Sequence, residues 1–278
     1  VADSGSIINA VGSTMNVTAT NLRLEADDAI GTAARHLTTS VTTLSANSTG
    51  TDAQGIYVTE ADSITVDSVA VTTTAFNSDA TTTDVTDAAQ ADLMAGNNGN
   101  IVLTTLNGSI VINDGDADQV GVVANGSGNI RLDANGSGAD ITNNAQINST
   151  TGHITVTAAD ALSILANITT ATNGTVTLDA EAGALTMAGA ITVTATNSSA
   201  RLNAATDVTL GNVVAENVSV VADSGSIINA AGSTMNVTAT NLRLAADDAI
   251  GTAARHLTTS VTTLSANSTG TDAQGIYV

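Results

Sequence analysis

The sequence contains no cysteine, proline, tryptophan or lysine, and its only aromatic residues are Tyr57, Phe76 and Tyr277. Without cysteine the chain forms no disulfide, and without lysine it has no Schiff base, P-loop lysine or lysine crosslink. Large rings fill the space between packed layers in ordinary protein cores. Their scarcity in 278 residues excludes a conventional globular core, so we expect a thin core lined by small aliphatic side chains.

Positive charge is also scarce, because six arginines face 26 acidic residues and the net charge is -20. A chain without basic patches or stacking rings lacks the main sources of nucleic-acid affinity, which excludes nucleic acid as a natural partner. With 42% hydrophobic and 12% charged residues the chain is nevertheless too apolar for a disordered acidic tail. No apolar run approaches the ~18 residues of a membrane helix, so we expect a soluble chain with no membrane span.

One long repeat organises the chain, since residues 1–58 return as residues 221–278 and differ only at Val11/Ala231 and Glu25/Ala245. Near-identical copies indicate a unit that stacks on itself. We therefore expect residues 1–220 to be one complete repeat unit and residues 221–278 to start the next. Because the chain starts at Val1 and stops within a repeat, we expect no true terminus or cap, and a continuation resembling residues 59–66.

Within the unit, short strands with alternating apolar residues recur about every twenty residues, which is the spacing of coils in a β-solenoid. This spacing predicts an all-β fold of roughly ten coils per unit, about 50 Å long at ~4.8 Å per stacked strand. The apolar positions that mark the series are Leu24, Leu44, Val66, Leu103, Leu132, Val156, Leu178, Leu202 and Val220.

Asn-Gly pairs at residues 98–99, 107–108, 125–126, 135–136 and 173–174 separate these strands. They are also typical of β-hairpins, so tandem antiparallel β-sandwiches are the competing fold. The absence of proline favours the solenoid, because nearly every strand in a stack donates its N–H groups to a neighbouring coil. The step between Val66 and Leu103 predicts a skipped coil or a long loop across Val71–Ala95, which is rich in Thr and Asp and holds Phe76.

Three stretches carry a resemblance to a known family: G-S-I-x-x-A at Gly5–Ala10, L-x-A-x-x-A-I-G at Leu24–Gly31 and G-x-V-x-L-x-A at Gly174–Ala180. The chain resembles the filamentous-haemagglutinin class of repetitive bacterial surface exoproteins, which includes the high-molecular-weight adhesins. This resemblance implies a right-handed parallel β-helix, secretion across an outer membrane, and adhesion or matrix formation at the cell surface or outside the cell.

One segment has the spacing of a cation-binding loop, since Asp114, Asp116 and Asp118 alternate as do positions 1, 3 and 5 of a calcium loop. The rest of that pattern fails, because Gln119 stands where the loop needs Gly and Asn125 where it needs Glu. The three aspartates are therefore a weak candidate site for a divalent cation. The alternative interpretation is an exposed acidic turn with no bound ion.

Asn-x-Ser/Thr sequons are the second candidate feature, and their asparagines are glycosylation candidates. An alternating strand of this composition also produces such sequons without any modification. The twelve asparagines are Asn16, Asn47, Asn107, Asn125, Asn135, Asn148, Asn167, Asn173, Asn197, Asn217, Asn236 and Asn267.

The sequence favours a non-enzymatic structural protein, namely an extracellular β-solenoid fibre or adhesin stalk with no cofactor. No histidine pair has metal-ligand spacing, and the acids are spread along the unit. Expected partners are further copies of the repeat, lateral neighbours in a fibre bundle, divalent cations or surface glycans. The alternatives are a carbohydrate-binding or carbohydrate-active β-helix, or tandem β-sandwich adhesin repeats.

Overall fold

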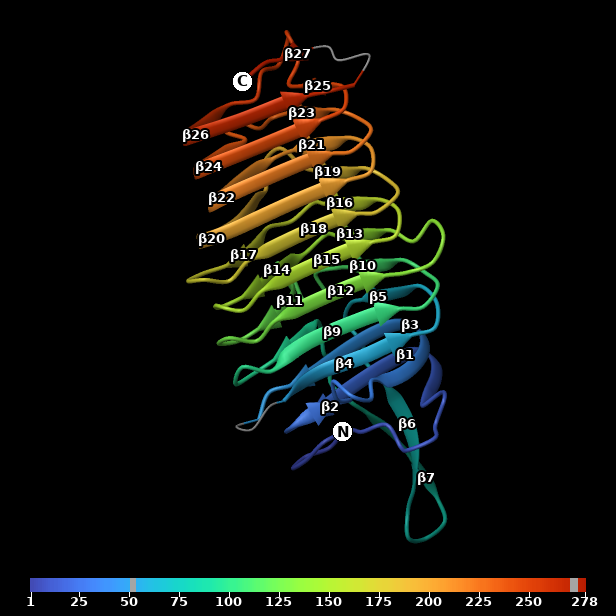
Figure 1. Ribbon diagram of the computed structural model, residues 1–278. Coiled ribbons are helices and arrows are strands. Elements are labelled where there is room, and N and C mark those ends of the chain that lie inside the picture. Colours follow the sequence, from blue (N-terminus) through green and yellow to red (C-terminus); the bar gives the residue numbers. More distant parts are fainter. Residues whose placement is uncertain (51–53, 271–274) are drawn as a thin grey trace.

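The computed structural model describes residues 1–50, 54–270 and 275–278, which form a right-handed parallel β-helix (Figure 1). The chain climbs from its N-terminal end to its C-terminal end, and 25 strands belong to one sheet. Every ladder within that sheet that is formed by the described residues is parallel, as in Ile130 beside Ile154. The described residues contain no helix of the length and apolarity needed to cross a membrane.

From residue 55 onward each coil has three sides, and each side is a ladder of strands. The first ladder contains β4 (Gly55–Glu60), β9 (Asn100–Thr105), β12 (Ile130–Ala134), β15 (Ile154–Ala158), β18 (Val176–Ala180) and the C-terminal parts of β20 (Thr192–Ala204), β22 (Asn212–Ala222), β24 (Val237–Ala246) and β26 (Thr259–Ser268).

The other two ladders are built from shorter strands. The second contains β5 (Ile64–Val66), β10 (Ile110–Ile112), β13 (Ile141–Asn143), β16 (Leu162–Ile164), β19 (Leu185–Met187), β21 (Val208–Leu210), β23 (Ile227–Asn229), β25 (Ala249–Ile250) and β27 (Gly275–Ile276). The third contains β8 (Leu93–Ala95), β11 (Val120–Ala124), β14 (Gln146–Ser149), β17 (Ile168–Thr170) and the N-terminal parts of β20, β22, β24 and β26.

The lowest coils contain two long strands, β1 (Val17–Ala26) and β3 (Leu37–Ser48), with the short strand β2 (Ala29–Ile30) between them in the sequence. Strand β3 lies on β1 along almost its whole length, and β4, β5 and β8 share the upper edge of β3. Between β5 and β8 the chain leaves the coil as an antiparallel hairpin of β6 (Thr72–Phe76) and β7 (Thr82–Thr86). Figure 1 shows this hairpin projecting past the lower end of the β-helix.

The strand pairings give the number of coils per unit. Eight successive pairings connect Ile30 with Leu242, by way of Ile56, Ile101, Ile130, Ile154, Val176, Ala200 and Val218. The counterpart of Ile30 in the second copy is Ile250, which lies in β25, the strand after β24 along the chain. One unit therefore makes eight coils and about one third of another, against the roughly ten expected, because the coil from Ile56 to Ile101 also contains the hairpin.

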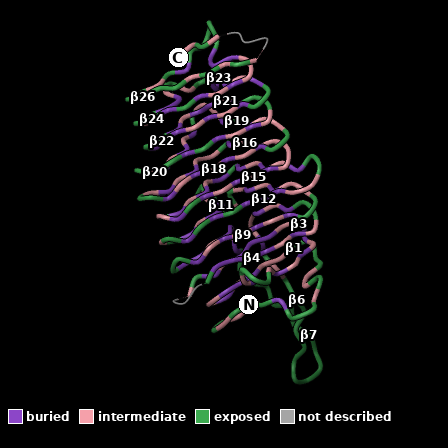
Figure 2. Tube along the Cα trace, in the orientation of Figure 1, coloured by how far each residue is buried: buried purple, intermediate pink, exposed green. Residues whose placement is uncertain are grey.

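The core is thin and aliphatic, as the lack of aromatics predicts. Inward positions of the first ladder, such as Leu132, Val156 and Leu178, are fully buried and stack coil upon coil. Figure 2 shows this as a line of buried positions running the length of the β-helix. Each such Val, Ile or Leu stabilises the fold by about 1.5–3 kcal/mol through the apolar area it removes from water.

Glycine and asparagine occupy the corner where the third ladder turns into the first. A Cβ on Gly128 or Gly152 would overlap the carbonyl oxygen of the glycine one coil below, so only glycine fits there. Next to this column, Asn100 Oδ1 accepts a hydrogen bond from the backbone N–H of Asn129, and Asn129 Oδ1 accepts one from that of His153, both at 2.8 Å. The Asn-Gly pairs thus mark corners of the coil and do not connect the antiparallel strands of a sandwich.

The two copies of the repeat adopt the same register, as expected from their near-identity. Val17 pairs with Thr39 as Val237 pairs with Thr259, and strands β1 and β24 have equivalent bounds. One part of the expected strand series was wrong. Val66 pairs with Leu44 and with Ile112, whereas Leu103 stacks on Val58, because β4 supplies the first ladder below β9.

Candidate functional site

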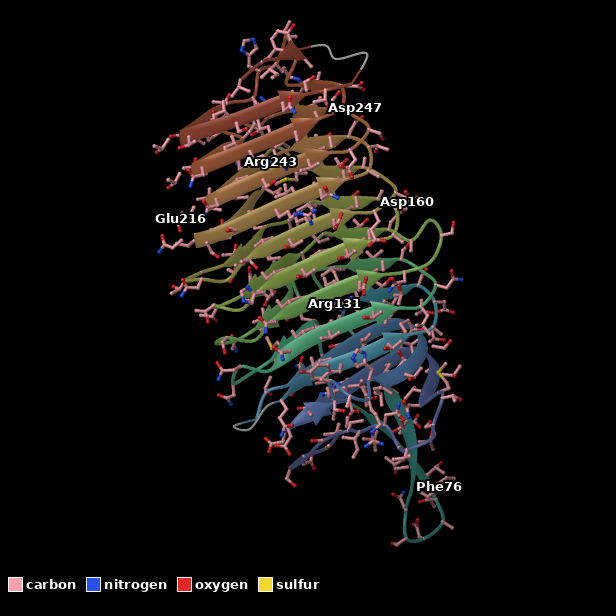
Figure 3. All side chains as sticks on the ribbon, viewed as in Figure 1. Phe76, Arg131, Asp160, Glu216, Arg243 and Asp247 are labelled. Carbon is pink, nitrogen blue, oxygen red and sulfur yellow. The ribbon has the colours of Figure 1, made fainter. Side chains whose placement is uncertain are left out.

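The β6–β7 hairpin is the segment that departs furthest from the coil pattern, and the sequence singled out the same stretch. Every residue of both strands is exposed, and Phe76 is 81% exposed. Side-chain hydrogen bonds cross the hairpin, including Thr72 Oγ1 to Thr86 Oγ1 at 2.7 Å and Thr74 Oγ1 to Asp84 Oδ1 at 2.9 Å. The hairpin therefore presents an aromatic ring to solvent on a polar support (Figure 3).

The base of the hairpin is buried and joined to the coils. Val69 and Gln90 form an antiparallel bridge, and both are buried. The amide Nε2 of Gln90 donates to the backbone oxygen of Leu24 at 2.9 Å and to Ser45 Oγ at 3.0 Å. These contacts connect the hairpin to the two coils beneath it.

Asp92 follows the hairpin directly, at the point where the chain re-enters the coil as β8. Its backbone oxygen accepts hydrogen bonds from Ala46 N–H at 2.9 Å and Ser45 Oγ at 3.2 Å, and its φ of 67° is left-handed. Asp tolerates this conformation better than most residues. The residue is 1% exposed, and its Oδ1 is buried without a hydrogen-bond partner. The backbone thus holds a carboxylate inside the protein with one oxygen unsatisfied.

The acidic loop between β10 and β11 lies over this carboxylate, in the coil above. Gly115 sits against Ser68 and Ala91, where a side chain would collide. Asp118 Oδ1 accepts a hydrogen bond from Val120 N–H at 2.7 Å, which fixes the end of the loop. One carboxylate oxygen from each of Asp92, Asp116 and Asp118 lies within 4.8 Å of the other two.

The pKa of Asp92 is raised to about 7, mainly by burial and then by the neighbouring negative charges of Asp116, Asp118, Asp114 and Asp67, in that order of importance. Desolvation and like charge both disfavour the ionised form. Each charge that acts on this carboxyl is therefore negative.

The structure brings together two of the three aspartates that the sequence predicted. Asp116 and Asp118 share the cluster with Asp92, while Asp114 lies beside an adjoining groove of about 310 Å³ lined also by Gln119 and Asn144. Sequence reasoning missed Asp92, because no local spacing relates it to the loop. The length of the hairpin coil brings position 92 close to the loop that carries Asp116 and Asp118.

The sequons lie at differing depths, and glycosylation itself stays a prediction. Asn107, Asn125, Asn173, Asn197, Asn217 and Asn267 are exposed, whereas Asn16, Asn47, Asn135, Asn148 and Asn167 are half-buried. Asn236 is fully buried, and its Nδ2 donates to the backbone oxygen of Leu210 at 2.7 Å and to Asn229 Oδ1 at 3.1 Å. A glycan on Asn236 would require this part of the coil to open.

An open groove of about 500 Å³ crosses the outer face of β20, β22 and β24. Arg201 and Arg243 lie on it, together with Asn217, Ser219 and Asn241. These groups can hydrogen-bond a sugar. Glycoside cleavage requires a pair of carboxylates flanking the bond, and none of the described residues that line the groove is acidic.

A second buried acid, Glu60, has a structural role. Glu60 is inaccessible to solvent, and it accepts hydrogen bonds from Thr39 Oγ1 at 2.6 Å and from the backbone N–H groups of Val41 and Ala61, both at 3.0 Å. Burial raises the pKa of Glu60, and these hydrogen bonds oppose the rise. The side chain joins β4 to the strand beneath it.

The chain matches no family model, and comparison with the curated proteins and with the solved structures found no match to it.

Proposed function

We propose that this chain is a stretch of an extracellular β-solenoid fibre or adhesin stalk, and that it acts by spanning distance without catalysing a reaction. One observation carries the proposal. The second copy of the repeat continues the ladders of the first unit without interruption, through pairings such as Val218 with Leu242. A unit that stacks on its predecessor in this way adds length and needs no linker.

Composition supports a location outside the cell, in the class of surface exoproteins that the sequence resembles. The chain has no cysteine, which suits an oxidising medium. Residues 1–220 carry 22 acids and four arginines, hence -18 per unit, and such a charge keeps long rods apart in solution. Attachment then requires a feature that departs from the uniform rod, and the exposed hairpin with Phe76 is that feature.

The length of the rod tests the stalk. Chains with one, two and three complete units should appear in electron micrographs as rods that lengthen by about 40 Å per unit, given ~4.8 Å per coil. Compact particles, or a length that does not grow with unit number, would contradict the proposal.

Removal of the hairpin tests where attachment occurs. A variant in which residues 71–87 are replaced by a short glycine-serine turn should keep the rod length and lose binding to cells or surfaces. The matched variant is Phe76→Ala in the intact hairpin. It removes only the aromatic ring and therefore separates the contribution of the ring from that of the rest of the hairpin. Unchanged binding by the shortened variant would assign attachment to the coils or to another part of the protein.

A further inference from the structure

The strongest unexplained feature of the molecule is the cluster of Asp92, Asp116 and Asp118. It draws its carboxylates from two successive coils, and their oxygens converge within 4.8 Å. None of the three ion pairs found in the described part of the chain includes a member of the cluster. Three acids therefore share one small volume without a basic neighbour.

Asp92 distinguishes this cluster from an ordinary acidic surface. Exposed acids at a turn are hydrated and need no partner. Asp116 and Asp118 are both exposed and, without Asp92, would be acids of this kind. Asp92 is 1% exposed, and its Oδ1 has no hydrogen-bond donor. A buried polar atom without a partner destabilises the fold, and more so when it is charged. A fold that keeps such an atom under two further carboxylates has the arrangement of a cation site.

We propose that Asp92, Asp116 and Asp118 bind one divalent cation, and that Ca²⁺ is the ion they suit. The site offers only hard oxygen ligands, which Ca²⁺ and Mg²⁺ prefer over nitrogen and sulfur. Ca²⁺ takes six to eight oxygens in flexible geometry, so three carboxylates from two neighbouring coils can be completed by backbone oxygens and water. Mg²⁺ requires a near-octahedral arrangement and gives up water reluctantly, which disfavours it here.

The position of the cluster gives the cation a structural role. Asp92 is the residue at which the chain returns from the hairpin, and the other two ligands belong to the loop of the coil above. A bound cation would connect these two segments and hold the upper side of the hairpin's base. Gln90 already connects its lower side to two coils.

Calorimetric titration with CaCl₂ in 150 mM NaCl tests the site, because this salt screens general attraction to the acidic surface. We expect one saturable site per 278-residue chain, with a dissociation constant on the order of 10⁻⁴ to 10⁻³ M, as in extracellular calcium modules. Asp92→Asn and Asp118→Asn should each weaken binding at least about tenfold, since each removes one charged ligand. Mg²⁺ should bind more weakly than Ca²⁺.

The matched control is Asp160→Asn, which makes the same change of charge on a turn outside the cluster (Figure 3) and should change affinity less than about twofold. Folding does not confound the comparison, since Asn tolerates the left-handed φ of position 92 and Asp118 is exposed. Circular dichroism of each variant checks this.

Hydrogen exchange locates the bound ion. Ca²⁺ should slow exchange in residues 88–95 and 113–120 of the native chain and leave the hairpin tip near residues 77–81 unchanged. Binding that does not saturate, or an equal loss of affinity in Asp92→Asn and Asp160→Asn, would overturn the site. Tighter binding of Mg²⁺ than of Ca²⁺ would overturn the assignment to calcium.

Discussion

The two copies of the repeat carry nearly the same side chains in different surroundings. Residues 1–58 have a coil above them and little below, whereas residues 221–278 have a coil below and little above. Leu44 is completely buried and its counterpart Leu264 is 44% exposed. In the opposite sense, Leu22 is half-buried and its counterpart Leu242 is 2% exposed. Strand register is the same in both copies, so it follows from the local sequence.

The two copies separate two contributions to the burial of a side chain, namely its position within the strand and the presence of a neighbouring coil. Alternation within a strand decides which side chains point inward. The neighbouring coil decides how much apolar area those side chains bury, which is why stability in a solenoid is a nearest-neighbour quantity. Paired substitutions at equivalent positions can measure the second contribution alone.

The largest difference should come from leucine in the core. Leu44→Ala should destabilise the chain by about 2–5 kcal/mol, because it leaves a cavity in a covered coil. Leu264→Ala should cost about 1 kcal/mol or less, because that side chain is partly in water. Urea unfolding followed by circular dichroism measures both. Equal losses would mean that burial by the neighbouring coil does not set stability.

The next contrast concerns the equivalent asparagines Asn16 and Asn236. Here the larger loss of stability is expected in the second copy, not in the first. Asn236 is buried and satisfied by Leu210 and Asn229, whereas its counterpart Asn16 is half-buried and bonds Asn9 and Ser13. Asn236→Ala should cost about 1–3 kcal/mol and Asn16→Ala less, since loss of a buried partner leaves other polar groups unsatisfied. Thermal unfolding of the two variants would show the order, and a larger effect at Asn16 would refute this explanation.

The third contrast depends on pH and concerns a contact that the described residues form in the first copy. Thr39 bonds Glu60 of the coil above, while its counterpart Thr259 has no such neighbour among the described residues. The pKa of Glu60 is raised in the folded state, so the folded state binds more protons than the unfolded state between the two pKa values. The contribution of Glu60 to stability is therefore fully present below the unfolded pKa and is lost as the pH rises through the folded one.

Glu60→Gln keeps the acceptor for Val41 and Ala61 and removes the titration. The variant should show a smaller loss of stability than the native chain as the pH rises above the ordinary range of a glutamate. Unfolding midpoints measured at several pH values provide the readout. An identical pH dependence in both chains would assign the effect to other acids.

The smallest effect is expected where the copies differ in sequence. Arg23 forms a 2.8 Å ion pair with Glu25 in the first copy, and Ala245 replaces that glutamate in the second. The glutamate of this pair is about half-exposed, and an ion pair open to solvent contributes about 0–1 kcal/mol, so Glu25→Ala and Ala245→Glu should each change the free energy of unfolding by less than about 1 kcal/mol. Chemical denaturation in low and high salt would detect any larger, salt-dependent change.

Much of the fold could be predicted from the sequence because coil formation is local. Alternating Ile, Val and Leu, corner glycines and the absence of proline all depend on positions a few residues apart. The coil at Val66 could not be placed, since the decision between Leu103 and Ile112 as its neighbour depends on where β4 lies. Asp92 could not be predicted for a similar reason. Its neighbours Asp116 and Asp118 are determined by the length of the inserted hairpin and not by a local sequence spacing.

The eight coils and one further strand of each unit set the geometry of a longer fibre. In an array of such units, each hairpin would be rotated by about 120° relative to the one before it, because a coil has three sides. Successive hairpins would then follow a helical path around the rod, about 40 Å apart along the axis, and every third would return to the same side. A rod with this screw symmetry would present its hairpins, each with an exposed Phe76, in three directions. Contact with a surface would then not depend on the rotation of the rod about its long axis.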